Sequence, residues 1–110
     1  MNYKVDTISN FDKELKKLAK KYPSIKNEIL ALGTSLVTHP AQGTPIGRGC
    51  YKIRLAIKSK GRGKSGGARV ITYVAVVDER VILLSIYDKA DQADIADDFL
   101  TQLLQEADIH

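Results

Sequence analysis

The sequence contains few of the residues on which disulfide, metal and cofactor chemistry depends. It has one cysteine, Cys50, two histidines and no tryptophan among 110 residues. A single thiol cannot close an internal disulfide, and no two Cys or His residues stand at the spacing of metal ligands. We therefore expect neither a metal nor a cofactor, and we expect Cys50 to be a small buried hydrophobic residue rather than a nucleophile.

Long apolar runs are also missing. No run approaches the roughly 18 residues of a membrane span, and the N-terminal stretch MNYKVDTISNFD lacks the apolar core of a signal peptide. These absences predict a cytoplasmic protein with no membrane partner. The length fits one domain over residues 1–110, and the 44% hydrophobic and 27% charged composition is typical of a globular chain.

Acidic residues are absent from one part of the chain. The segment from Arg48 to Arg69 carries eight basic residues and no acid, although the net charge of the whole sequence is only +4. The rest of the chain, with nine basic and thirteen acidic residues, is therefore net negative. This separation predicts a surface that binds a polyanion, with a merely solubilising surface as the alternative interpretation.

The first third of the sequence predicts a strand followed by two helices. Residues 3–8 are β-prone and roughly alternating. Ser9 is a suitable cap for a helix that runs to Pro23, and Ser24 can cap a second helix with apolar residues at helical spacing. The short break between the two helices predicts an α-hairpin.

The centre of the sequence predicts a loop over residues 39–49 and then a strand over residues 50–58. Alternation along this strand places Lys52 and Arg54 on one face and apolar residues on the other. Residues 59–67 are rich in Gly, Ser and Lys, which predicts a flexible basic loop.

The last third of the sequence predicts two interior strands, over residues 68–77 and 81–87, joined by a tight turn. Asp91 is expected to cap a final helix, whose dipole would favour the acids that follow, Asp94, Asp97 and Asp98. The order β-α-α-β-β-β-α predicts an α+β fold: an antiparallel meander sheet with an N-terminal helical hairpin and a C-terminal helix.

Three segments together resemble one known family: CYKIRL, KGRGKSGGARVITY and VVDERVILLSIYDKADQADI, which begin at Cys50, Lys60 and Val76. They resemble the RelE/ParE superfamily of type II toxin–antitoxin toxins, and the HigB-like RelE group in particular. The resemblance implies a RelE-like fold and a ribosome-dependent mRNA endoribonuclease (mRNA interferase) that inhibits translation. It also implies three partners: a cognate antitoxin, the decoding site of the ribosome, and mRNA.

The resemblance further implies a mechanism without metal, in which the ribose 2′-OH attacks the adjacent phosphodiester. Arg54 and Arg69 would hold the scissile phosphate, and Tyr87 would orient the substrate or the leaving group. Lys52 or Lys89 would serve as the base or as an electrostatic stabiliser. Arg54 stands where a lysine is the base in the best-known member, and because arginine keeps its proton in proteins, Lys52 or Tyr87 would have to accept it.

A second set of basic residues would grip RNA without performing chemistry. This set comprises Arg48, Lys58, Lys60, Arg62 and Lys64. Two alternatives stay open beside the nuclease. One is a ParE-type inhibitor of DNA gyrase with no nuclease activity, and the other is an inert family member that only binds its antitoxin.

Overall fold

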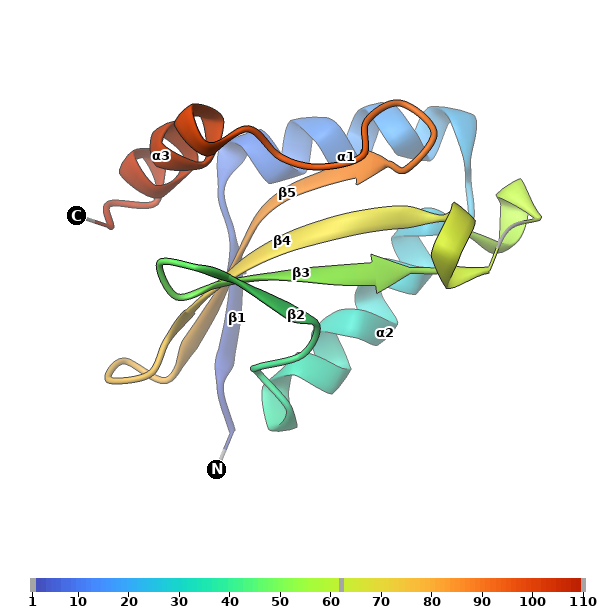
Figure 1. The fold of residues 1–110 in the computed structure, drawn as a ribbon. Helices are drawn as coiled ribbons and strands as arrows, with labels where there is room; N and C mark the ends of the chain where they lie inside the picture. Colours follow the sequence, from blue (N-terminus) through green and yellow to red (C-terminus); the bar gives the residue numbers. More distant parts are fainter. Residues whose placement is uncertain (1, 62, 110) are drawn as a thin grey trace.

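The chain forms a five-stranded sheet with helices on both faces (Figure 1). The computed structural model describes residues 2–61 and 63–109, so that Arg62, one of the residues predicted to bind RNA, lies outside the described residues. The elements are β1 (Lys4–Thr7), α1 (Ser9–Lys21), α2 (Ile25–Thr38), β2 (Thr44–Gly47), β3 (Cys50–Leu55), the 3₁₀ helices η1 (Lys58–Lys60) and η2 (Lys64–Gly66), β4 (Ala68–Ala75), β5 (Arg80–Asp88) and α3 (Asp97–Glu106).

The strand order in the sheet is β1-β5-β4-β3-β2. Strands β2 to β5 form the antiparallel meander, and β1 pairs with β5 in parallel. The predicted α+β meander with a helical hairpin and a C-terminal helix is thus confirmed. No helix in the described part of the chain is long and apolar enough to span a bilayer.

Two apolar cores lie on opposite faces of the sheet. Helices α1 and α2 cover one face, where Phe11, Ile25 and Leu36 are fully buried. Helix α3 covers part of the other face with three leucines, which belong to the same cluster as Cys50. Cys50 is only 1% exposed, as expected, and burial raises the pKa of its thiol to about 11. A neutral thiol of this kind is a packing residue and not a nucleophile.

Several predicted boundaries were wrong. The last helix begins at Asp97, not after Asp91, and Ala96 is its N-cap. Helix α1 begins at Ser9 itself, with Ile8 at the cap position. Residues 39–49, predicted to be a loop, contain β2, which pairs with the first half of β3. The expected flexible basic loop contains η1 and η2.

Candidate active site

One row of side chains crosses three neighbouring strands. Arg54 on β3 is the register partner of Arg69 on β4, and Arg69 is the register partner of Tyr87 on β5. Register partners have neighbouring Cβ atoms on the same face of a sheet, about 5 Å apart. Lys52 lies two residues before Arg54 and therefore on the same face. The topology thus brings together four of the five residues predicted to be catalytic.

Tyr87 belongs to this row only because β5 contains a bulge. The register of β4 and β5 shifts between Ile71 and Thr72, which leaves Leu84 as an extra residue on β5. Before the shift, even-numbered residues of β5 face α3, as Leu84 does; after it, Ile86 faces α1 and α2, and Tyr87 faces α3. An unbroken alternation would have placed Tyr87 on the opposite face from Arg69.

Arg54 and Lys52 are the accessible cations of the row. Arg54 is exposed, whereas the Lys52 side chain is 25% exposed and its Nζ lies 3.4 Å from Asp94 Oδ1. A hydrogen bond from the Ile95 amide, supported by Lys52, holds the pKa of Asp94 below its usual value. Asp94 therefore lies in the turn before α3 as the partner of Lys52, and not within the helix where the dipole was expected to favour it.

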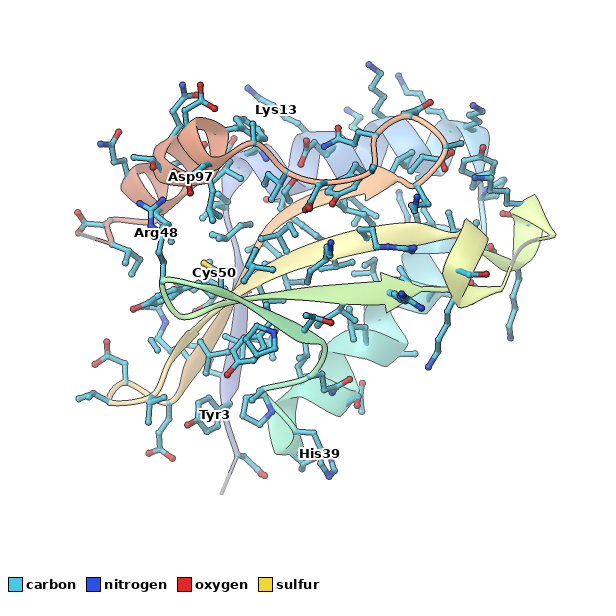
Figure 2. All side chains as sticks on the ribbon, viewed as in Figure 1. Tyr3, Lys13, His39, Arg48, Cys50 and Asp97 are labelled. Atoms are coloured by element: carbon cyan, nitrogen blue, oxygen red, sulfur yellow. The ribbon has the colours of Figure 1, made fainter. Side chains whose placement is uncertain are left out.

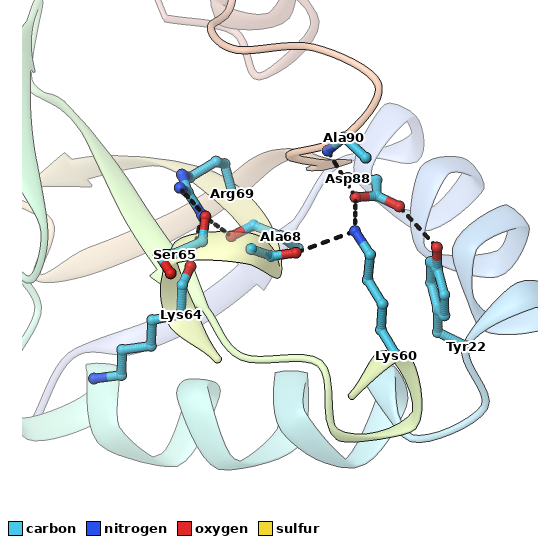
Figure 3. Close-up of polar contacts among 9 residues, drawn as sticks. Tyr22, Lys60, Lys64, Ser65, Ala68, Arg69, Asp88 and Ala90 are labelled. Atoms are coloured by element: carbon cyan, nitrogen blue, oxygen red, sulfur yellow. Dashed lines mark hydrogen bonds and ion pairs between the residues drawn. The ribbon is translucent and has the colours of Figure 1, made fainter. Parts of the chain in front are cut away.

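Arg69 is turned away from solvent and is only 4% exposed. Its Nη1 donates to the carbonyl oxygens of Lys64 (2.8 Å) and Ala68 (3.0 Å), and its Nη2 donates to that of Ser65 (3.0 Å; Figure 3). In this conformation the guanidinium therefore holds η2 against the start of β4. These bonds use both N–H groups of Nη1 and one of Nη2, so a phosphate that takes their place must displace the carbonyl oxygens of η2.

The Tyr87 hydroxyl is buried and has no hydrogen-bond partner among the described residues. Burial raises the pKa of Tyr87, Asp94 raises it further, and Arg69 opposes both. The phenol is consequently neutral at physiological pH. It can donate a hydrogen bond or a proton, but it is a poor base, which argues against Tyr87 as the group that accepts the 2′-OH proton.

Lys89, the fifth predicted catalytic residue, follows the end of β5. Its backbone N–H donates to the carbonyl of Gly67 (3.0 Å), so the chain at Lys89 is still beside the start of β4. The side chain is half-buried. Lys89 thus lies just past the end of β5, two residues after Tyr87 and beside the residue that precedes β4.

The structure divides the residues predicted to grip RNA. A groove of about 750 Å³ between α2 and the edge of β3 is lined by Lys58 and Lys64 together with Lys52 and Arg54. Lys60 instead forms an ion pair with buried Asp88 and donates to the Gly66 carbonyl (3.1 Å; Figure 3).

Arg48 is also apart from the groove. It lies in the turn between β2 and β3, where its Nη1 is 3.6 Å from Asp97 Oδ1 and 2.8 Å from Thr101 Oγ1 of α3 (Figure 2). Sequence reasoning missed three carboxylate partners of the basic residues: Asp88, Asp94 and Asp97. No local pattern indicates them, because each contacts a residue that is distant in the sequence.

The fold is that of a toxin of the RelE class. A family model described as the RelE toxin of the RelE/RelB toxin–antitoxin system matches residues 10–109. The chain therefore belongs to the RelE toxin family, as its sequence predicts.

Solved structures agree with this fold. A double-mutant RelE toxin of E. coli in the free state has 20% identity and a TM-score of 0.61, over 97% of this chain and 95% of that chain. The toxin–antitoxin complex RelBE2 of Mycobacterium tuberculosis has 18% identity and a TM-score of 0.60, over 80% and 99%. The E. coli mutant in complex with an antitoxin RelBc peptide has 21% identity and a TM-score of 0.51, over 93% and 94%.

Proposed function

We propose that this toxin inhibits translation as a ribosome-dependent mRNA endoribonuclease that cuts in the decoding site. The observation that carries the proposal is the row of Arg54, Arg69 and Tyr87 across β3, β4 and β5, with Lys52 beside it. Phosphodiester cleavage needs positive charge on the phosphate, an acid for the leaving oxygen and a base for the 2′-OH, and the two cations and the neutral phenol of the row match the first two. The HigB-like assignment belongs to the same proposal.

The accessibility of each side chain suggests its role. Arg54 is exposed and would meet the scissile phosphate first. Arg69 would join it once the phosphate replaces the carbonyl oxygens of η2 as the acceptor. Tyr87, held neutral by its raised pKa, would orient or protonate the leaving 5′-oxygen. Lys52 or Lys89 would then be the base for the 2′-OH or a further stabiliser of charge.

The partners of the proposed reaction are mRNA, the ribosome and an antitoxin. Lys58 and Lys64 line the same groove as Lys52 and Arg54, so RNA next to the scissile bond would meet four cations there. A cognate antitoxin is proposed because the family is that of the RelE/RelB system. Cytoplasmic location is part of the same proposal, since ribosomes are there.

Arg54→Ala is the cleanest test of the proposal. Loss of one cation that stabilises charge in the transition state lowers the rate by about 10²–10³-fold. The free energy of unfolding should change by less than about 0.5 kcal/mol, because Arg54 is exposed. Primer extension on mRNA, with and without purified ribosomes, measures cleavage. Lys26→Ala, which removes one exposed charge from α2, is the matched control and should cut normally.

Arg69→Ala is less informative because it also removes the hydrogen bonds that hold η2. We expect it to lose about 1–3 kcal/mol of stability as well as cleavage.

The gyrase alternative is tested by assaying the wild-type toxin for mRNA cleavage and for inhibition of DNA gyrase supercoiling. Intact messages combined with a loss of gyrase supercoiling would contradict the nuclease proposal, and so would full cleavage by the Arg54 variant.

A further inference from the structure

Helix α1, which packs on the face of the sheet opposite to the row on β3, β4 and β5, carries a second cationic surface. Its lysines recur at spacings of three, four and seven residues, with two adjacent pairs, so that they lie on one side of the helix. All are exposed: Lys13, Lys16, Lys17, Lys20 and Lys21. We call this set the α1 lysine stripe. Figure 2 shows Lys13 and a row of nitrogen-tipped side chains on the outer side of α1. The inner side, with Phe11, Leu15 and Leu18, packs on the sheet.

No ion pair among the described residues neutralises this stripe, although contact with Tyr22 and the nearby charges of Asp91 and Asp88 raise the pKa of Lys21. The four described ion pairs involve Lys52, Lys60, Arg48 and Arg80, and none involves a lysine of α1. Like charges at these helical spacings cost about 0.2–0.5 kcal/mol for each pair. The helix dipole offsets part of this repulsion at Lys20 and Lys21 in the last turn, and a bound polyanion would relieve the rest.

The chemistry of the stripe favours phosphate over a protein partner. Lysine binds phosphate as a compact point charge. Protein interfaces are instead depleted in lysine and depend on buried aromatic or apolar anchors. The large apolar side chains that stand exposed in the described structure, Leu30, Val76 and Val77, belong to α2 and to the β4–β5 turn, not to α1. The α1 lysine stripe thus offers charge without an anchor.

The second half of the stripe lies beside Tyr87 of the candidate active site. Lys17 and Lys21 line a groove of about 350 Å³ together with Tyr87 and three acids, Glu14, Asp88 and Asp91. From Lys13 to Lys21 the helix rises about 12 Å at roughly 1.5 Å per residue. A duplex strand presents one phosphate per about 3.4 Å of its axis, so the stripe spans about three phosphates. One RNA could therefore approach both surfaces, or two RNA segments could occupy them together.

We propose that the α1 lysine stripe is a second RNA-binding surface, which docks on the phosphate backbone of a structured RNA while the β3–β5 row acts on the substrate strand. The identification of the polyanion as RNA rests on the proposed function. The inference that the stripe binds a polyphosphate backbone rests on its charge alone and does not depend on the proposed function. Such a surface would supply affinity without sequence readout, because phosphate contacts position a protein but do not specify bases.

The test compares two double variants that change the net charge equally. Lys16→Gln with Lys20→Gln alters the stripe, and Lys4→Gln with Lys26→Gln alters exposed lysines of β1 and α2. Glutamine and lysine have similar helix propensities, and Lys4 is exposed on strand β1, so both variants should fold, which circular dichroism checks. The probe is a fluorescent RNA duplex without single-stranded regions, and the measurement is its affinity as a function of KCl concentration. All proteins carry Arg54→Ala, so that cleavage plays no part.

We expect the stripe variant to bind the duplex about tenfold more weakly at low salt. Its log–log salt slope should be smaller by about 1.8, which is two phosphate contacts at about 0.9 each. The control should match the parent protein. Equal behaviour of the two variants would overturn the proposal. So would polyglutamate that competes as well as the duplex, because the stripe would then fit an acidic protein. If the parent keeps the stripe-dependent slope but the wild-type toxin never cuts mRNA, only the proposed nuclease fails.

Discussion

At the scale of single residues, Glu14 connects helix α1 to the bulge that positions Tyr87. Its Oε1 accepts hydrogen bonds from Ser85 Oγ (2.8 Å), Asn10 Nδ2 (2.8 Å) and the Ile86 amide (3.2 Å). Strand β1 pairs only with residues Arg80–Leu83 of β5. Glu14 and Asn10 therefore satisfy the backbone of β5 where no strand adjoins it. The bulge depends on this cap from α1 because unpaired buried amides are costly.

Glu14→Ala should cost about 1–3 kcal/mol of the free energy of unfolding, since it leaves the Ile86 amide without an acceptor. Glu14→Gln should cost far less because its amide oxygen can still accept that bond. Urea unfolding of both variants measures the difference. Equal losses for the two substitutions would contradict the role assigned to Glu14 as an acceptor.

The same site predicts a pH dependence. Burial raises the pKa of Glu14 above its ordinary 4.5, despite its hydrogen bonds. The folded state then binds this proton more tightly than the unfolded chain, so this contribution to stability is complete below pH 4.5 and is lost as the pH rises through the raised pKa. Glu14→Gln does not titrate. We expect its stability relative to wild type to be highest near neutral pH and to fall as the pH approaches 4.5. A constant difference would contradict the raised pKa.

At the scale of elements, the basic segment between β3 and β4 is anchored at two points and is not freely flexible. Arg69 holds η2 through carbonyl oxygens, and Lys60 of η1 pairs with Asp88 of β5. Asp88 is 1% exposed and also accepts from Tyr22 Oη (3.0 Å) and the Ala90 amide (2.9 Å). Burial alone would raise the pKa of Asp88, but hydrogen bonds led by that from Lys60 outweigh it and leave the pKa lowered.

Lys60→Ala should therefore loosen this segment. A hydrogen bond between charged groups contributes about 1.5–3 kcal/mol, so the population of the open segment should rise at least about tenfold. Limited proteolysis with trypsin measures this opening. Lys58→Ala is the matched control, because it also removes one charge and one trypsin site, but from an exposed side chain. Equal cleavage rates for the two variants would show that the Lys60–Asp88 pair does not restrain the segment.

The elements themselves could largely be predicted from the sequence because they rest on local periodicity. Alternation along β3 correctly separated Lys52 and Arg54 from Ile53 and Leu55. The stripe of apolar residues in α2 correctly gave its buried face, Ile25, Ile29, Leu32 and Leu36. Strand β2 was missed because a Pro- and Gly-rich stretch becomes a strand only through pairing with β3.

The candidate site was less predictable because it depends on contacts between distant residues. A one-residue bulge decides which face Tyr87 occupies, and it is held by Glu14, more than 70 residues earlier in the chain. The spacing of the acids predicted that Asp94 lies in the last helix. It lies before that helix instead, where it pairs with Lys52. Sequence patterns likewise treat Arg69 as a surface cation, although the carbonyl oxygens of η2 allow it to be buried.

At the scale of the whole molecule, the two cores are unequal in their links to the sheet. The core under α1 and α2 includes residues from five elements of the fold and joins β1 to the rest of the sheet. Helix α3 instead packs its leucines on one face. Arg48 contacts Asp97 at its start and Thr101 in its middle, and Glu106 at its end accepts a hydrogen bond from the Asn10 amide (3.0 Å). We infer that α3 can open without unfolding the sheet, since stability is rarely uniform over a structure.

Cys50 reports on this opening because its thiol is buried in the α3 core and has a pKa of about 11. Leu103→Ala and Phe11→Ala each remove a large buried side chain, at a cost of about 2–5 kcal/mol. In the Leu103 variant, labelling of Cys50 should become fast and nearly independent of urea, because local opening exposes little surface. In the Phe11 variant, labelling should rise steeply with urea, because it requires global unfolding. The same steep dependence in both variants would mean that α3 and the sheet unfold as a single unit.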